Sequence, residues 1–138
     1  MKEVFVDTHY WVAIANPNDQ WHEAAMLAKR ALGNVKLVTT DEVLIEFLSF
    51  LSRYGELLRV QGAKIVRAIL NNASVSVVPQ SRQSFLTALE FYENRKDKQY
   101  SLVDCISMMT MKNRLITDVL TNDEHFSQEG FKILIAKQ

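Results

Sequence analysis

Four carboxylates in this 138-residue sequence stand at positions where ordinary surface charge is not expected. Asp7 and Asp123 each follow a short stretch that has the composition of a buried strand. Glu46 and Asp104 lie within segments rich in apolar residues, and Asp104 falls between methionines on a helical wheel. A carboxylate inside apolar surroundings must be paired, hydrogen-bonded, protonated or bound to a metal. These acids are therefore the first candidates for chemistry.

Four ionised carboxylates in one crevice would repel one another unless cations lay between them. Hard divalent ions such as Mg²⁺ and Mn²⁺ bind oxygen ligands of this kind. Carboxylates that hold one or two such ions can activate water and stabilise the charge that develops in phosphodiester cleavage. The chain has one cysteine, Cys105, which excludes an intramolecular disulfide and a multi-cysteine metal site. The residue set thus predicts metal-dependent hydrolysis with water as the nucleophile.

Each acid also has a structural interpretation, and the sequence leaves both open. Asp7 and Asp123 are placed to cap the helices expected after them. Asp104 stands three residues after a serine, which is the spacing of a capping-box variant. Glu46 lies at the edge of an apolar helix face, where it could pair with Arg53 or be solvated.

The elements that would position these acids alternate between strands and helices. Short β-rich runs are expected to form strands at 3–6, 36–39, 75–78, 116–121 and 131–135. Apolar spacing and cap residues predict helices at 10–15, 21–32, 41–53, 56–72, 82–95, 102–112 and 123–128. This alternation is typical of a three-layer α/β fold with a short, mainly parallel sheet flanked by helices. Functional residues in such folds lie beyond the carboxyl ends of the strands.

The composition limits the other classes of protein. The 16 Lys and Arg residues balance 16 Asp and Glu residues, which argues against a strongly basic nucleic-acid binder. A nucleic-acid function would need a local basic patch or a metal ion to supply positive charge. No targeting segment and no apolar stretch of about 20 residues is visible, so we expect one cytoplasmic domain over residues 1–138.

Four stretches of the sequence resemble the PIN-domain ribonucleases, and in particular the VapC-like toxins of type II toxin–antitoxin pairs. They are VFVDT at 4–8, TTDEVLIE at 39–46, YSLVDCIS at 100–107 and LTNDEHF at 120–126. The resemblance implies a PIN-like fold and a metal-dependent endoribonuclease that uses Mg²⁺ or Mn²⁺, with one or two ions in the site. It carries the metal-binding acids of the family over to Asp7, Glu46, Asp104 and Asp123. It also implies that Thr121 helps to hold the metal or its water.

Two alternatives remain at the residue level. Glu42 lies one turn before Glu46 and could face the same crevice, but Glu46 matches the family position after an apolar triplet. Among the histidines, none forms a recognisable metal-binding spacing, and His22 and His125 are interpreted as structural. Candidate cations for gripping RNA lie in the segments 29–30, 53–67 and 95–98.

The resemblance further implies an RNA substrate and an antitoxin protein as partner. The helices expected at 41–53 and 56–72 carry more apolar residues than one side of a short sheet readily covers, so we expect a homodimer. The alternative function is a non-catalytic RNA- or protein-binding module of the same fold, whose acids are only helix caps.

Overall fold

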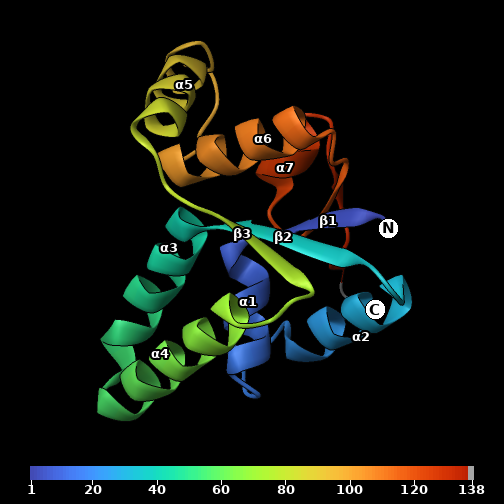
Figure 1. Ribbon diagram of the computed structural model, residues 1–138, viewed down its shortest axis with the longest axis vertical. Coiled ribbons are helices and arrows are strands. Elements are labelled where there is room, and N and C mark those ends of the chain that lie inside the picture. The colour runs from blue at the N-terminus through green and yellow to red at the C-terminus, as the bar shows by residue number, and fades with distance from the viewer. Residues whose placement is uncertain (137–138) are drawn as a thin grey trace.

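The computed structural model describes residues 1–136, which form five strands and seven α-helices (Figure 1). The strands are β1 (Glu3–Val6), β2 (Lys36–Thr40), β3 (Val75–Val78), β4 (Asp118–Leu120) and β5 (Lys132–Ile133). The helices are α1 (Thr8–Ala15), α2 (His22–Leu32), α3 (Asp41–Leu51), α4 (Glu56–Leu70), α5 (Arg82–Glu93), α6 (Leu102–Arg114) and α7 (Glu124–Gln128). A 3₁₀ turn, η1 (Ser52–Tyr54), follows α3.

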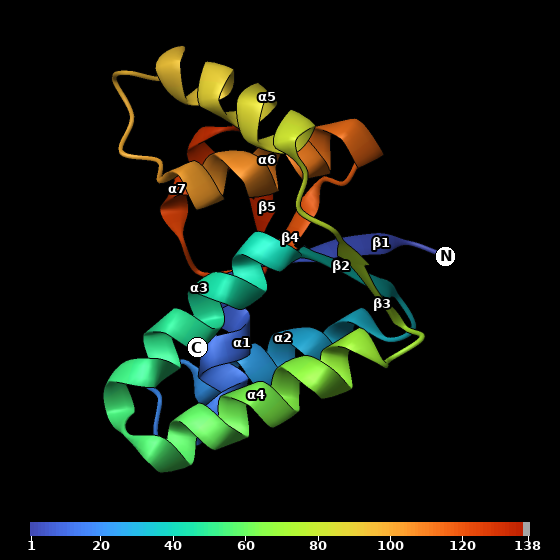
Figure 2. The same ribbon diagram turned by 60° about the vertical axis from the view of Figure 1, so that its left-hand side comes forward.

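The strands form one sheet in the order β3-β2-β1-β4-β5, and every neighbouring pair is parallel. Strand β1 lies in the middle, where Phe5 is in register with Val38 of β2 and Val119 of β4. Helices α6 and α7 cover one face with α5 beyond them, and α1, α2 and α4 cover the other (Figure 2). The predicted three-layer α/β fold with a parallel sheet is confirmed.

Strand β1 lies deep in the molecule because helices cover it on both faces. Its three apolar residues, Val4 to Val6, are fully buried. Strands β1 and β4 run in parallel and end at the same edge of the sheet. The residues that follow them, Asp7 and Thr121, therefore meet at that edge, as a doubly wound sheet requires.

Several elements end a few residues away from the predicted positions. Helix α3 ends at Leu51, and the chain tightens into η1 before Gly55, which has a φ of 94°. Strand β4 begins at Asp118, two residues later than predicted, because the Ile116 N–H still donates to the Met111 carbonyl of α6. Strand β5 is likewise reduced to Lys132–Ile133.

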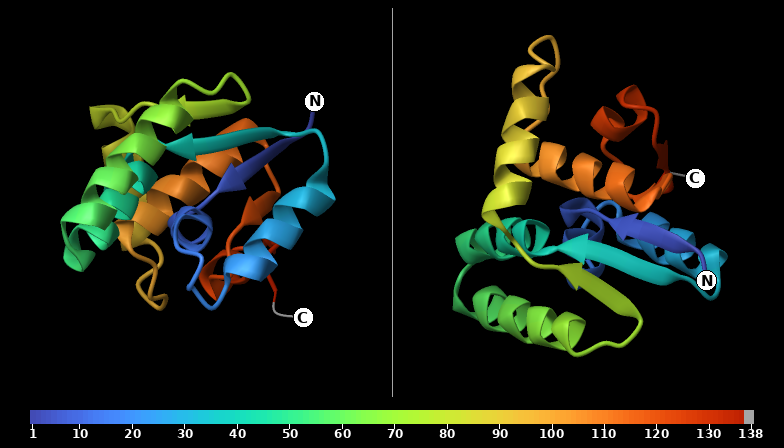
Figure 3. Two further views of the ribbon diagram at one scale, coloured as in Figure 1. Left: turned by 90° about the horizontal axis from the view of Figure 1, so that it is seen from below. Right: turned by 45° about the horizontal axis from the view of Figure 1, so that its top comes forward.

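Helices α3 and α4 form a close antiparallel hairpin that extends from the sheet (Figure 3). Gly62 of α4 permits the close approach, because a Cβ atom there would lie 2.8 Å from Leu51 Cδ1 and 3.2 Å from Leu48 Cδ2. On the other side of the sheet, α5 projects away from the body of the molecule (Figure 3). Among residues 1–136, none of the helices combines the length and the apolar character needed to cross a membrane.

Candidate metal-binding acidic site

Asp7 is the buried centre of the candidate site. It follows β1 at the N-cap position of α1, and only 5% of its surface is exposed. Its Oδ2 accepts a hydrogen bond of 2.9 Å from the Thr121 hydroxyl. Burial, and next the negative charge of Asp104, raise the pKa of Asp7 to about 7 from 3.8, although the bonds from Thr121 and the Thr8 backbone oppose this shift.

Asp104 combines a structural role with a position in the site. The Ser101 hydroxyl accepts from the Asp104 N–H, and Asp104 Oδ2 accepts from the Ser101 N–H, each at 3.0 Å, which completes a capping box at the start of α6. Asp104 therefore caps α6, as its structural interpretation predicts. It also lines the same hollow as Asp7, so the two roles are compatible. Burial raises the pKa of the Asp104 carboxyl.

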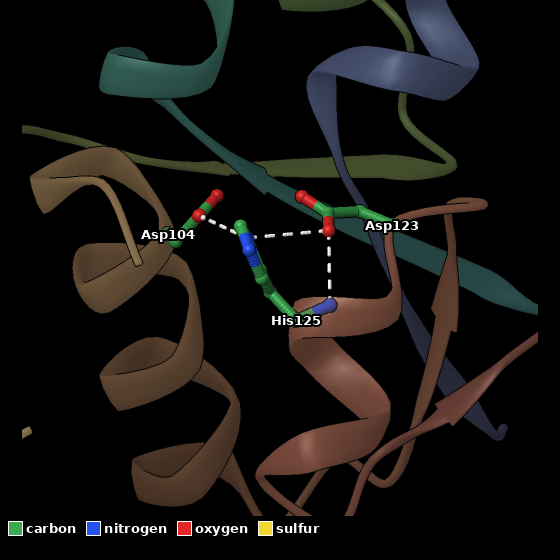
Figure 4. A group of neighbouring side chains, drawn as sticks. All are labelled: Asp104, Asp123 and His125. Atoms are coloured by element: carbon green, nitrogen blue, oxygen red, sulfur yellow. Dashed lines mark hydrogen bonds and ion pairs between the residues drawn. The ribbon is translucent and has the colours of Figure 1, made fainter. Parts of the chain in front are cut away.

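Asp123 caps α7, and its Oδ1 accepts a 2.9 Å bond from the His125 N–H. The His125 side chain then folds back, so that Nδ1 lies 3.3 Å from Asp123 Oδ1 and 3.3 Å from Asp104 Oδ2. Figure 4 shows the imidazole between these two carboxylates, which come from the starts of α6 and α7. A histidine that sequence reasoning treated as structural is thus part of the acidic site.

Glu46 lies on α3 and lines the same hollow as Asp7 and Asp104. Its Oε1 accepts a hydrogen bond from the Thr8 hydroxyl. In the part of the chain that the structure describes, Glu46 forms no ion pair with Arg53. Glu42 instead lines a different hollow together with Ser81 and Phe85. Of the two glutamates between which the sequence left a choice, Glu46 is therefore the one that lies beside the other acids.

All four predicted acids line one cleft with a volume of about 450 Å³. The lining residues are Asp7, Thr8, His9, Glu46, Gln99, Ser101, Asp104, Asn122, Asp123 and His125. Thr121 lies beneath this surface and is fully buried. Its hydroxyl donates to Asp7 and accepts from the Asp123 N–H at 3.1 Å, so it connects two of the acids.

His9 is a second cleft residue that sequence reasoning did not select. Its ring packs edge-on against Trp21, and within residues 1–136 its buried Nδ1 has no hydrogen-bond partner. The signal for both cleft histidines was weak, because His9 and His125 each stand two residues after an acid that begins a helix. His22 has the structural role expected of it, since its Nδ1 lies 2.8 Å from the Ala13 carbonyl oxygen of α1.

The chemistry of this donor set fits a divalent cation. One ligand atom each from Asp104, Asp123 and His125 lies within 4.8 Å of the others. Across the described residues, none of the four cleft acids forms an ion pair with Lys or Arg. Crowded carboxylates without such partners are what a hard cation neutralises, and Mn²⁺ accepts imidazole nitrogen as well as oxygen.

Sequence comparison finds relatives along nearly the whole chain. The model of the PIN domain family matches residues 4–132. The 23S rRNA-specific endonuclease VapC20 of Mycobacterium tuberculosis, in strains CDC 1551 and H37Rv, is 30% identical over 129 residues. That alignment covers 93% of this chain and 95% of VapC20.

The fold of this chain is also similar to those of solved structures. The crystal structure of M. tuberculosis VapC20, described as a sarcin-ricin loop cleaving toxin, superposes with a TM-score of 0.85 at 28% identity and covers 96% of this chain and 99% of that one. DNA-bound VapBC from Salmonella typhimurium has the same fold, with a TM-score of 0.68 at 14% identity over 96% of this chain and 97% of that one. Because the family model and the VapC20 alignment both span more than nine-tenths of the sequence, the chain belongs to the PIN domain family.

Proposed function

We propose that this protein is a metal-dependent endoribonuclease and the toxin of a type II toxin–antitoxin system. The observation that carries the proposal is the cleft in which Asp7, Glu46, Asp104 and Asp123 meet without a Lys or Arg partner among the described residues. The likeness to VapC20, which is named a 23S rRNA-specific endonuclease, supports RNA as the substrate class. We further propose that residues 1–138 act as one nuclease domain in the cytoplasm.

The four acids would hold Mg²⁺ or Mn²⁺, as one or two ions, and His125 would add an imidazole nitrogen. When bound, such an ion lowers the pKa of a water molecule and neutralises charge on the phosphate oxygens of the RNA. The protein needs no serine or cysteine nucleophile for this reaction. Cys105, next to Asp104, is fully buried and serves the core.

The residues around the acids fix them before any substrate arrives. Thr121 fixes the Asp7 carboxylate, Thr8 fixes that of Glu46, and the capping box fixes Asp104. The His125 ring lies between the carboxylates of Asp104 and Asp123, with Nδ1 3.3 Å from an oxygen of each. Such preorganisation limits the rearrangement needed to bind a cation or to meet the phosphate.

The same proposal includes protein partners. Apolar side chains on the α3–α4 hairpin remain solvent-exposed in the single chain, namely Ile45, Tyr54, Leu57, Val60 and Leu70. Exposed apolar surface of this kind marks protein-binding sites. We propose that it serves homodimerisation and binding of an antitoxin, and the description of VapC20 as a toxin supports the second role.

Cleavage of RNA by the purified protein tests the proposal directly. Fragments of 23S rRNA should be cut with Mn²⁺ or Mg²⁺, and excess chelator should stop the reaction. Asp104→Asn should abolish cleavage while the chain stays folded, whereas Glu23→Gln, at an exposed position of α2, should cut like the wild type. Cleavage in excess chelator would contradict the metal mechanism. RNA binding without cleavage under every divalent ion would favour the non-catalytic module.

A further inference from the structure

A second hollow of about 350 Å³ lies beside the acidic cleft, where α5 ends and the chain turns toward α6. Its lining includes the cations Arg95, Lys96 and Lys98 and the rings of Tyr92 and Tyr100, which together we call the basic pocket. The basic pocket and the acidic cleft share a strip of backbone. Lys98 and Tyr100 line the pocket, while the alternate residues Gln99 and Ser101 line the cleft.

Tyr100 forms the partition between the two hollows. It is buried, its hydroxyl donates to Glu129 Oε1 at 3.0 Å, and its ring packs edge-on against the His125 ring with centroids 5.6 Å apart. His125 is the cleft residue that lies between two of the acids. Tyr100 therefore lines the basic pocket and contacts a residue of the acidic cleft, so the two hollows are neighbours.

Glu129 fixes the position of Arg95, one of the cations that line the basic pocket. This carboxylate accepts two bonds from Arg95, of 3.0 and 2.8 Å, and one of 3.1 Å from Lys112, in addition to the Tyr100 bond. The Arg95 guanidinium also lies over the Phe91 ring, 4.4 Å from its centroid. Glu129 thus compensates the charge of Arg95 and fixes its position, so the uncompensated charge of the pocket comes from its lysines.

The two lysines are available to a ligand. Lys98 has a single ion-pair contact, at 3.8 Å, with the exposed Asp97, and within residues 1–136 Lys96 has none. Glu93 also lines the pocket and partly offsets their charge. Tyr92 at the same site is 46% exposed, and its ring offers a flat apolar surface beside the two lysines.

We propose that the basic pocket binds the RNA strand that flanks the cleaved phosphodiester, with Lys96 and Lys98 on phosphates and Tyr92 stacked on a base. The inference rests on the proposed function of the acidic cleft. The protein has a net charge of +0 and its cleft carries four acids, so an ion held there can attract the phosphate at the cleft, whereas the flanking phosphates need local cations beside it. Lysines next to an exposed aromatic ring are the usual combination for single-stranded nucleic acid.

The charged residues of the α3–α4 hairpin are less well placed for this contact. Arg59, Lys64 and Arg67 are exposed on α4, which lies on the opposite side of the sheet from α5 (Figure 2). None of these three side chains lines the acidic cleft or the basic pocket among the described residues. The hairpin cations therefore provide a charge-matched comparison.

The test compares two double variants that each remove two exposed positive charges: Lys96→Ala with Lys98→Ala, and Lys64→Ala with Arg67→Ala. Single-turnover cleavage of a short single-stranded RNA is measured with Mn²⁺ over a range of salt concentrations. For the pocket variant, half-saturation should need about ten-fold more protein, and the slope of log affinity against log salt should fall by about 1.4, since each single-strand phosphate contact adds about 0.7. The maximal rate should not change, and the hairpin variant should match the wild type.

Tyr92 supplies an independent arm of the test. Tyr92→Ala should weaken RNA affinity about five-fold or more, whereas Tyr92→Phe should not, because stacking needs the ring and not the hydroxyl. Thermal unfolding midpoints of all variants should equal that of the wild type, because the substituted side chains are exposed.

Three results would overturn the inference: a pocket variant that behaves like the hairpin variant, a larger loss in the hairpin variant, or a fall in maximal rate with unchanged affinity. In each case wild-type cleavage would leave the proposed function standing. The converse is also distinguishable, because binding of the same RNA can be measured by fluorescence anisotropy without cleavage. If no divalent ion supports cleavage but the pocket lysines still govern affinity, the pocket stands and the nuclease function fails.

Discussion

Asp7→Asn should stabilise the metal-free protein at alkaline pH, although it removes a residue of the candidate metal site. The folded protein holds the pKa of Asp7 at about 7, against 3.8 ordinarily, because the carboxyl is buried next to Asp104. Below pH 3.8 the Asp7 carboxyl is protonated in both the folded and the unfolded protein. As the pH rises from 3.8 through about 7, the unfolded chain releases the proton more readily than the folded protein, so stability is lost over this range. The ceiling of this loss is about 4 kcal/mol, since one pKa unit is worth about 1.4 kcal/mol.

The net gain from the substitution is smaller than this ceiling. An asparagine at position 7 keeps an acceptor for the Thr121 hydroxyl, but it adds an amide N–H₂ that must find partners in a buried place, which costs about 1–2 kcal/mol. We therefore expect a gain of about 2 kcal/mol at pH 8 in chelator. For a chain of this length that corresponds to a rise of about 7 °C in Tm.

Thermal unfolding at pH 5 and pH 8, in chelator and in Mn²⁺, measures both consequences. In chelator, the Tm advantage of Asp7→Asn should be small at pH 5 and large at pH 8. In Mn²⁺ the wild type should gain stability and the variant should not, because a bound ion stabilises only the state that binds it. Asp97→Asn, at an exposed position, controls for the general loss of a negative charge. A variant that melts below the wild type at pH 8 in chelator would refute the reasoning.

Three further changes test the surroundings of the site. Glu46→Gln should lower RNA cleavage by at least about ten-fold and Glu42→Gln should not, because only the first lines the acidic cleft; equal rates would remove Glu46 from the site. Thr121→Val should weaken Mn²⁺ binding by about 10–100-fold in calorimetry, since this hydroxyl connects two of the acids; unchanged affinity would contradict that role. Glu129→Gln should lower stability by about 1–2 kcal/mol at pH 7. Hydrogen bonds from Arg95, Lys112 and Tyr100 hold the pKa of Glu129 at about 2, so the stability advantage of the wild type should vanish as the pH falls from 4.5 toward 2. If denaturant unfolding shows a stability difference that does not depend on pH, Glu129 is not ionised in the folded protein.

The elements near the acids were predictable because local signals coincide there. Strand β1 is an unbroken apolar run that ends at an acid, and a strand buried on both faces has this pattern. Asp104 stood out because apolar residues surround it on the helical wheel, and residues 104–108 and Met111 of α6 are indeed buried. The 3₁₀ turn η1 was not predictable, since its residues continue the helical pattern and the positive φ of Gly55 is what ends it.

The composition of the cleft depended on distances that no local pattern carries. Glu42 and Glu46 lie one turn apart on α3, and only the packing of α3 against its neighbours sends them into different hollows. His125 enters the site because α7 begins close to the start of α6, which brings its ring to Asp104 across 21 positions of sequence. The sequence pattern identified which residues could act, and the tertiary structure determined which of them meet.

The central position of β1 divides the chain into two complementary parts. From β1 the sheet grows in one direction through β2 and β3, and in the other through β4 and β5. Asp7 and Glu46 come from the first part of the chain, whereas Asp104 and Asp123 come from the last. A break within residues 94–99, between α5 and α6, would leave two fragments that each carry half of the acids. Such fragments would be inert alone and would restore the cleft only by pairing β1 with β4, so recovered cleavage would report their reassembly.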